Sequence, residues 1–184
     1  MTKRSPTLRD ITASPAAPET DIAGLTADSR QVQPGFLFAA LAGTAANGAD
    51  YIDNAIRRGA VAILSAPGVA LTQPGITHLT DDNPRRAFAE MAARFTPAQP
   101  ETIAAVTGTN GKTSVVHFAA QIWTDLGLSA ASLGTLGVRG PVSADPLELT
   151  TPEPVALHRA LADLAGQGVA CLALEASSHG LDQH

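Results

Sequence analysis

The chain has 184 residues, of which 45% are hydrophobic, and a formal net charge of −5. Its basic residues are scattered, so the composition does not indicate a nucleic-acid-binding surface. No apolar run approaches the about 20 residues that cross a bilayer, and none follows the basic N-terminus as a signal peptide requires. Cys171, the single cysteine, lies in an apolar run and is predicted to be a buried structural thiol. We therefore expect a cytoplasmic, monomeric protein without membrane insertion.

Short strands and helices alternate through the first hundred residues. Residues 1 to about 20 contain three prolines and little periodicity, so we expect a loose start there. Asn83 and Pro84 are a typical helix start, and Gly59 is a typical helix end. The segment 96–100 contains two prolines and is the predicted domain boundary. Strands are predicted at 22–30, 36–41, 61–65 and 76–80, and helices at 50–58 and 84–95.

Beyond this boundary the predicted elements follow a βαβαβ pattern. Strands are predicted at 103–107, 129–134 and 169–174, and helices at 113–126 and 153–166. Such alternation predicts a parallel sheet covered by helices. The sequence ends ten residues after the last predicted strand, so we expect an incomplete domain. The predicted fold class is α/β, with a small N-terminal α/β domain over 1–100. The first part of a P-loop parallel-sheet ATPase domain, truncated, follows over 101–184.

The most informative motif is the loop Gly108–Ser114, which reads Gly-Thr-Asn-Gly-Lys-Thr-Ser between a predicted strand and a predicted helix. Its glycines allow a tight turn whose amides approach an oxyanion, at the positive end of the helix. Lys112 adds a positive charge, and Thr113 offers a hydroxyl to Mg²⁺. The alternative is a glycine-rich connection, but Gly-Lys-Thr at such a junction favours nucleotide binding. Val106 stands where the usual motif has its first glycine, which argues against an ordinary kinase or GTPase.

A second polar group follows the last predicted strand. Glu175 comes directly after the apolar run 169–174, and His179 follows four residues later. Ligands of open parallel sheets bind beyond the carboxyl ends of the strands, where the glycine-rich loop also opens. A carboxylate there can hold Mg²⁺ beside phosphates, although a solvated loop acid and a surface histidine are the alternative. The shared sheet edge favours metal binding more for Glu175 than for His179. Three other histidines are interpreted as surface or structural residues: His78, His117 and His158.

Two further motifs have simple structural interpretations. Leu149–Pro152 places two threonines before a proline, which is a common start of a helix. Asp28–Arg30 is a possible turn with a local ion pair. From the residues alone, we interpret both motifs as local structure.

Four segments together resemble the Mur ligase family of peptidoglycan synthesis, over a stretch from about residue 22 to the end. The glycine-rich loop identifies the family and explains its short form. The segment that begins at Glu175, with Thr150 and Thr151, is most similar to the MurE-type ligases. These add the third residue of the stem peptide to UDP-N-acetylmuramoyl-L-alanyl-D-glutamate. The segments are Asp28–Arg30 with Pro34–Gly35 and Leu37–Phe38; Gly43 with Asn47–Gly48 and Tyr51–Ile52; Thr107–Thr113; and Glu175–Leu181.

The resemblance implies an ATP-dependent acid–amino-acid ligase that uses ATP and Mg²⁺. The γ-phosphoryl group would pass to the D-glutamate γ-carboxylate, and the amine of diaminopimelate or lysine would then displace phosphate. The implied catalytic residues are Lys112, Glu175 and His179, and the implied metal ligands are Thr113, Glu175 and His179. The implied ATP-binding residues are Gly108, Thr109, Asn110, Gly111, Lys112, Thr113 and Ser114. The implied substrate-binding residues are Ser29, Thr44, Ala45 and Ala46 in the UDP-sugar-binding domain, and Thr150, Thr151, Ser177 and Gln183 beyond it.

The chain departs from the family pattern in several places. Leu149 stands where an asparagine often precedes the threonine pair, and Asn47 replaces a common aspartate. Asp82–Arg85 spells the tetrapeptide that marks diaminopimelate specificity in the family's C-terminal domain; here we interpret it as a helix cap. The family's carbamylated lysine and its amino-acid-binding domain fall beyond residue 184, so we expect residues 1–184 alone to lack ligase activity. A phosphotransferase or NTPase, and a non-catalytic nucleotide- or UDP-sugar-binding module, remain alternatives.

Overall fold

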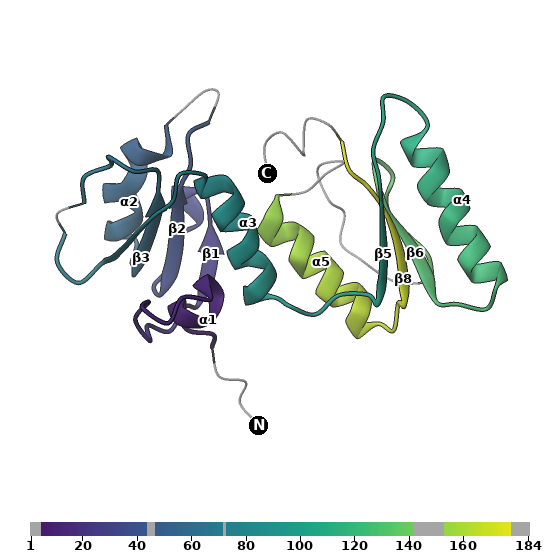
Figure 1. The fold of residues 1–184 in the computed structure, drawn as a ribbon, viewed down its shortest axis with the longest axis horizontal. Helices are drawn as coiled ribbons and strands as arrows, with labels where there is room; N and C mark the ends of the chain where they lie inside the picture. The colour runs from purple at the N-terminus through teal and green to yellow at the C-terminus, as the bar shows by residue number, and fades with distance from the viewer. Residues whose placement is uncertain (1–4, 44–46, 72, 142–152, 178–184) are drawn as a thin grey trace. The chain divides into compact units, whose positions relative to one another are not determined.

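The computed structural model describes residues 5–43, 47–71, 73–141 and 153–177. The backbone divides into two compact units, Met1–Phe95 and Thr96–His184 (Figure 1). The division falls at the start of the segment 96–100, and each unit has a four-stranded sheet of its own. Among the helices that the structure describes, none is long and apolar enough to span a membrane.

The sheet of the first unit has four parallel strands in the order β1-β2-β3-β4. Three of them match the predicted strands. The first strand is shorter than predicted, because the Asp28 side chain accepts a hydrogen bond from the Arg30 amide and starts the 3-10 helix η1 (Ser29–Gln31). The predicted turn at this motif is therefore confirmed. The strands are β1 (Gly24–Thr26), β2 (Phe36–Ala40), β3 (Ala62–Ser65) and β4 (Thr77–Thr80).

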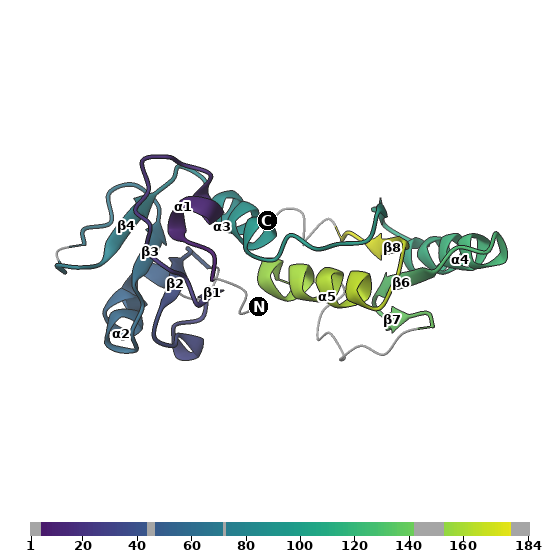
Figure 2. The same ribbon diagram turned by 90° about the horizontal axis from the view of Figure 1, so that it is seen from below.

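Helices lie on both faces of this sheet (Figures 1 and 2). On one face, Ile52 and Ala55 of α2 are buried in a cluster with Phe38 of β2. On the other face, α1 and α3 contact each other. The Asn83 side chain accepts a hydrogen bond from the Arg86 amide and caps α3, which confirms the predicted helix start. The helices are α1 (Leu8–Thr12), the 3-10 helix η2 (Gly48–Tyr51), α2 (Ile52–Arg57) and α3 (Pro84–Phe95).

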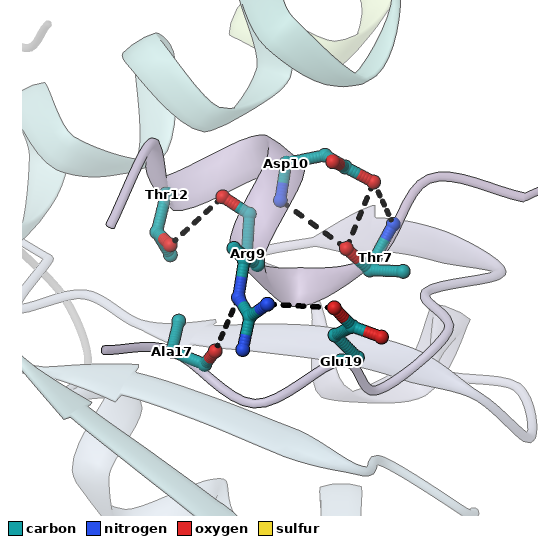
Figure 3. A network of polar contacts seen from close by, with 6 residues as sticks. All are labelled: Thr7, Arg9, Asp10, Thr12, Ala17 and Glu19. Atoms are coloured by element: carbon teal, nitrogen blue, oxygen red, sulfur yellow. Dashed lines mark hydrogen bonds and ion pairs between the residues drawn. The ribbon is translucent and has the colours of Figure 1, made fainter. Parts of the chain in front are cut away.

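The expected loose start was wrong from Thr7 onward, because α1 is capped and packed. Leu8 and Ile11 have no exposed surface. The Asp10 carboxylate accepts a hydrogen bond from the Thr7 amide at 2.8 Å, and the Asp10 amide donates to the Thr7 hydroxyl at 3.3 Å (Figure 3). A Thr-x-x-Asp capping box thus starts one helical turn whose two apolar residues, three positions apart, are buried.

Side-chain contacts also hold the chain after α1 (Figure 3). Arg9 Nε donates to the Ala17 carbonyl at 3.1 Å, and its Nη1 forms an ion pair with Glu19 at 2.6 Å. Main-chain hydrogen bonds from the Leu8 amide to Thr20 and from the Ile22 amide to Pro6 join the two ends of this segment. The prolines therefore shorten the regular structure without releasing the segment from the unit.

The sheet of the second unit has the order β5-β8-β6-β7. Its three predicted strands are confirmed and are parallel, with the last one in the chain between the other two. An antiparallel strand was not predicted; it pairs Gly137 with Gly134 across a turn formed by Thr135 and Leu136. Three residues are too few to produce a recognisable period in the sequence. The strands are β5 (Thr102–Val106), β6 (Ala130–Gly134), β7 (Gly137–Arg139) and β8 (Cys171–Glu175).

The helices α4 (Lys112–Asp125) and α5 (Pro154–Gly166) cover opposite faces of this sheet (Figure 1). Leu161 of α5 packs in a cluster with Leu172 of β8, while α4 contacts β6 and β8. Successive side chains of a strand point to opposite faces, so Glu175, three residues after Leu172, lies on the α4 face. Cys171 is buried, as predicted.

Candidate phosphate and nucleotide-sugar sites

The loop after β5 leaves main-chain amides at the start of α4. Gly111 precedes the helix with φ 81° and ψ −2°, and no described side chain caps it. A Cβ at Gly111 would meet no described atom within 4 Å, so the left-handed conformation, not a lack of space, favours glycine. Gly108 also has a positive φ, of 144°. The uncapped end of a 14-residue helix and its preceding turn therefore suit an oxyanion.

Lys112 places its charge over the same loop. Its Nζ donates to the Gly108 carbonyl at 2.7 Å, so the side chain folds back from the first turn of α4. Thr113 is half-buried and Ser114 is exposed beside it. Amide dipoles, one ammonium group and two hydroxyls thus gather within a single turn. This combination stabilises multiply charged anions such as phosphates.

Glu175 lies at the same edge of the sheet as this loop. It is the last residue of β8, is only 2% exposed, and pairs in register with Val106, the last residue of β5. The Ala176 amide donates to the Val106 carbonyl at 2.9 Å, which keeps the two chains together beyond the pair. The glycine-rich loop and Glu175 therefore leave adjacent strands side by side.

Two residues that were not predicted lie against the Glu175 carboxylate, and Thr135 forms hydrogen bonds with it. Thr135 donates its main-chain N–H to Oε1 at 3.0 Å and its hydroxyl to Oε2 at 3.1 Å. Gly134 lies against the same carboxylate, since a Cβ there would stand 2.2 Å from Oε1. The Gly-Thr-Leu-Gly sequence at 134–137 was a visible signal, but its partner is 40 residues away in the chain.

The residues at this edge fit a Mg²⁺ ion shared with phosphates. Thr113 and Glu175 offer oxygen ligands, which Mg²⁺ prefers. Within the described ranges, no group of three or more His, Cys, Asp or Glu side chains could hold a metal. Mg²⁺ at nucleotide sites commonly takes one or two protein oxygens and completes its shell with phosphate and water, which this donor set allows.

Several predicted site residues lie outside the described part of the chain. Ser177 is described and is half-buried just after β8. The helix predicted at 153–166 is confirmed as α5, but the expected cap within Leu149–Pro152 was wrong, because α5 begins at Pro154 with Glu153 as its N-cap. Proline is favoured at the first helical position because it has no amide to satisfy there, and the side chain of Glu153 makes no cap hydrogen bond. The residues outside the described ranges are Thr44, Ala45, Ala46, Thr150, Thr151, His179 and Gln183.

Two of the three histidines that were interpreted as surface or structural residues form side-chain contacts. His78 Nε2 lies 2.9 Å from the hydroxyl of the buried Ser65, and His117 Nδ1 lies 3.3 Å from the Ser132 hydroxyl. Partial burial lowers the pKa of His158 on α5. These contacts hold neighbouring elements together within each unit.

The first unit contains an open pocket of about 560 Å³ beyond the carboxyl ends of β1 and β2. At its rim, Arg30 donates from Nε and Nη2 to the two Asp28 oxygens at 2.9 and 2.8 Å. These hydrogen bonds hold the pKa of Asp28 below its ordinary value. Ser29, between them, is 8% exposed. The lining residues are Ala27, Asp28, Ser29, Arg30, Phe38, Leu41, Gly48, Tyr51 and Asn54.

Residues on both sides of the segment 44–46 are anchored next to this pocket. Ala42 and Asn47 form an antiparallel bridge. Arg85, in the first turn of α3, donates to the Ala42 carbonyl. The Asp-Asn-Pro-Arg tetrapeptide therefore caps α3 through Asn83, as predicted, and also fixes the chain beside the pocket.

Known proteins match both units of the chain. Residues 21–96 match the profile described as "Mur ligase family, catalytic domain", and residues 106–184 match the profile of the Mur ligase middle domain. The chain belongs to the Mur ligase family. The second match begins at Val106, two residues before the glycine-rich loop, and includes Glu175.

Curated relatives of this Mur ligase chain are named UDP-N-acetylmuramoyl-L-alanyl-D-glutamate–2,6-diaminopimelate ligase. The one from Brucella melitensis is 53% identical over 91% of the chain, and the one from Caulobacter vibrioides is 50% identical over 100% of it. The chain spans about a third of their length, 34% and 38% respectively.

Solved structures of Mur ligases share the fold. A structure of a protein with the same name as these relatives is 29% identical with a TM-score of 0.82, and the match covers 97% of this chain and 37% of that one. The MurF ligase from Thermotoga maritima, solved in complex with ADP, is 22% identical with a TM-score of 0.55. That match covers 84% of this chain and 32% of that one, and indicates the fold alone.

Proposed function

We propose that the chain carries the ATP site and the UDP-sugar site of a ligase that adds a diamino acid to UDP-N-acetylmuramoyl-L-alanyl-D-glutamate. The main support is the pairing of the Gly-Lys-Thr loop with Glu175 on adjacent strands of a Mur ligase fold. The names of relatives about half identical to the chain favour diaminopimelate over lysine. We further propose that the protein works in peptidoglycan synthesis, in the cytoplasm and as a monomer.

In this proposal, residues 108–114 bind the ATP phosphates. Lys112 neutralises charge on the terminal phosphates, because its ammonium already lies over the loop. Thr113, Glu175 and His179 are the protein ligands of Mg²⁺. The ion supplies charge neutralisation between ATP and the substrate carboxylate.

The pocket of the first unit takes the uridine part of the second substrate. Its volume of about 560 Å³ falls within the range of about 300–1,000 Å³ that is usual for small-molecule sites. Ser29 contacts the uridine from the lining of the pocket, and Thr44, Ala45 and Ala46 also contact it. The muramoyl-dipeptide is contacted by Thr150, Thr151, Ser177 and Gln183.

The reaction requires a carboxylate to be held in line with the ATP γ-phosphate. An oxygen of the D-glutamate γ-carboxylate bonds to the γ-phosphorus, the bond from phosphorus to ADP breaks, and an acyl phosphate forms. The amine then bonds to the acyl carbon, inorganic phosphate leaves, and the nitrogen releases a proton to give the amide. Positioning and charge stabilisation carry most of such a phosphoryl transfer.

A chimera tests this proposal directly. Residues 1–184 replace the matching region of the Brucella melitensis relative, and the protein is incubated with ATP, Mg²⁺, the UDP-muramoyl-dipeptide and either diaminopimelate or lysine. We expect an amide product with diaminopimelate, detected by mass spectrometry. ADP release without amide product would indicate a phosphotransferase or NTPase. Nucleotide binding without ADP release would indicate a binding module. The unmodified relative is the matched control.

A further inference from the structure

We propose that Thr135 is a positioning residue that holds the Glu175 carboxylate in the orientation required to bind a divalent cation. This inference rests on the proposed function of Glu175 at the phosphate site. Thr135 has no assigned role, and it comes from the strand pair β6–β7 that the sequence did not predict.

The two hydrogen bonds fix the carboxylate in two directions at once. The Thr135 N–H reaches Oε1 at 3.0 Å and the hydroxyl reaches Oε2 at 3.1 Å, so rotation of the carboxylate would break both. Each carboxylate oxygen has two lone-pair directions. Thr135 occupies one on each oxygen, and the remaining directions suit a cation or its bound water. Outer hydrogen bonds of this kind orient the ligands of many metal sites.

Gly134 supplies the space for this arrangement. A Cβ at Gly134 would stand 2.2 Å from Glu175 Oε1 and 2.5 Å from its Cδ and Cγ, which no real contact permits. Gly134 lies in a strand and is not among the glycines with positive φ, so its backbone would accept another residue. Glycine is therefore required here because the Glu175 side chain lies flat against it.

The β6–β7 hairpin explains why Thr135 is held so firmly. The pairs Ser132–Arg139, Leu133–Val138 and Gly134–Gly137 close a turn that contains only Thr135 and Leu136. A two-residue turn leaves little freedom to its members. The short strand β7 thereby fixes the Thr135 N–H and hydroxyl above the end of β8, on the face where α4 and the glycine-rich loop lie.

The test measures the binding of ATP to the chain of residues 1–184 with Mn²⁺ and with EDTA, by isothermal titration calorimetry. Thr135→Val keeps the N–H and the size but removes the hydroxyl. We expect it to weaken Mn²⁺-dependent ATP binding by about tenfold, as is common for outer-shell partners, with metal-free ATP binding unchanged. Thr135→Ser restores the hydroxyl and should recover the parent's Mn²⁺ dependence. Leu136→Ala, in the same turn, is the matched control.

Gly134→Ala is a second way to release the Glu175 carboxylate from Thr135. The added Cβ displaces the carboxylate, while the Thr135 side chain itself is unchanged. This variant should also lose Mn²⁺ dependence. The inference is overturned if Thr135→Val behaves as the parent, if serine fails to rescue, or if the variants weaken metal-free binding equally. A parent chain whose ATP binding ignores Mn²⁺ would refute the proposed cation site itself, and the positioning role with it.

Discussion

The two units differ in how most of their helices start: in the first unit every described start except that of α2 has a side-chain cap, and in the second unit neither α4 nor α5 has one from a described residue. In the first unit, main-chain amides at four starts donate to side chains, those of Thr7, Asp28, Asn47 and Asn83. In the second unit, α4 starts at Gly111, and no described side chain caps it. A polar side chain satisfies these amides internally, whereas glycine leaves them to a ligand. The pocket of the first unit is therefore lined by side chains, whereas the proposed phosphate site would use main-chain amides.

The positive charges near the two sites also differ: one is paired with a carboxylate and, among the described residues, the other is not. Arg30 at the pocket rim is paired with the Asp28 carboxylate. Lys112 donates to carbonyl oxygens, which carry no net charge, so its positive charge is left for an anion. A uridine group needs shape and neutral hydrogen bonds, while a triphosphate needs uncompensated positive charge.

Removal of the Lys112 charge should give the largest effect. In the chimera, Lys112→Ala should lower the rate of amide formation by about 100-fold or more, because a preorganised charge on the transferring phosphoryl group is lost. Product formation is measured at saturating substrates. Arg57→Ala, on the exposed surface of α2, is the control for loss of one positive charge and should match the parent. If the Lys112→Ala chimera forms the amide at a rate within twofold of the parent, the glycine-rich loop is not the phosphate site.

Neutralising Glu175 should have the next largest effect. Glu175→Gln keeps the shape but loses the charge that attracts a cation, so about tenfold more Mg²⁺ should be needed for the same ATP binding. The Mg²⁺ dependence of ATP affinity is titrated on the chain of residues 1–184. Glu153→Gln, at the start of α5, is the control. Overlapping titrations of parent and Glu175→Gln would leave Glu175 as a loop acid without a metal role.

Some parts of this molecule could be predicted from sequence because their signals are local. The helix α3 has a cap, a proline and twelve residues of periodic pattern, and β8 lies at the end of the continuous apolar run 169–174. The glycine-rich loop is recognisable within seven residues. In contrast, α1 has five residues and β7 has three, too few for periodicity to distinguish them from loops. Their stability comes from packing and pairing with distant elements.

The residues of the candidate site likewise fall into those with a local sequence signal and those whose contacts depend on distant segments. Lys112 and Glu175 each follow from a motif next to a strand, and both lie at the sheet edge. The contact between Thr135 and Glu175 depends on β8 lying between β5 and β6, an order that no local pattern contains. The role of Arg85 beside Ala42 likewise joins residues 43 positions apart. Residues that hold other residues in place are therefore the ones that sequence reasoning misses.

Gly111 and Gly127 offer a matched pair that separates conformation from binding. Both have φ near 80°, at 81° and 82°, and a Cβ at either would meet no described atom within 4 Å. Alanine in the left-handed region costs about 1–2 kcal/mol, so both Gly→Ala variants should lower the free energy of unfolding by that amount. Only Gly111→Ala should also weaken ATP binding. The affinity should fall roughly fivefold for each 1 kcal/mol of binding free energy that is lost because the loop is distorted. Equal ATP affinities for the two variants would mean that the conformation of Gly111 does not contribute to ATP binding.

The smallest expected effect concerns the charge of Asp28 in the first unit. Asp28→Asn keeps an oxygen that can accept from the Arg30 amide but removes the charge. Hydrogen bonds from the Arg30 side chain lower the pKa of Asp28 in the folded chain. The carboxylate therefore stabilises the fold above its unfolded pKa of about 3.9, and this contribution is lost as the pH falls through the lower folded pKa. Because the pair is solvent-facing, Asp28→Asn should lower the free energy of unfolding by about 0.2–1 kcal/mol at pH 7.

This prediction is measured by urea unfolding at pH 7, 5 and 3. The difference in free energy of unfolding between Asp28→Asn and the parent should narrow at pH 3, while Asp53→Asn on α2 provides the control. A difference that stays constant or widens in acid would mean that Arg30 does not lower the pKa of Asp28. Added salt should narrow the difference at pH 7 as well, since an exposed pair is screened.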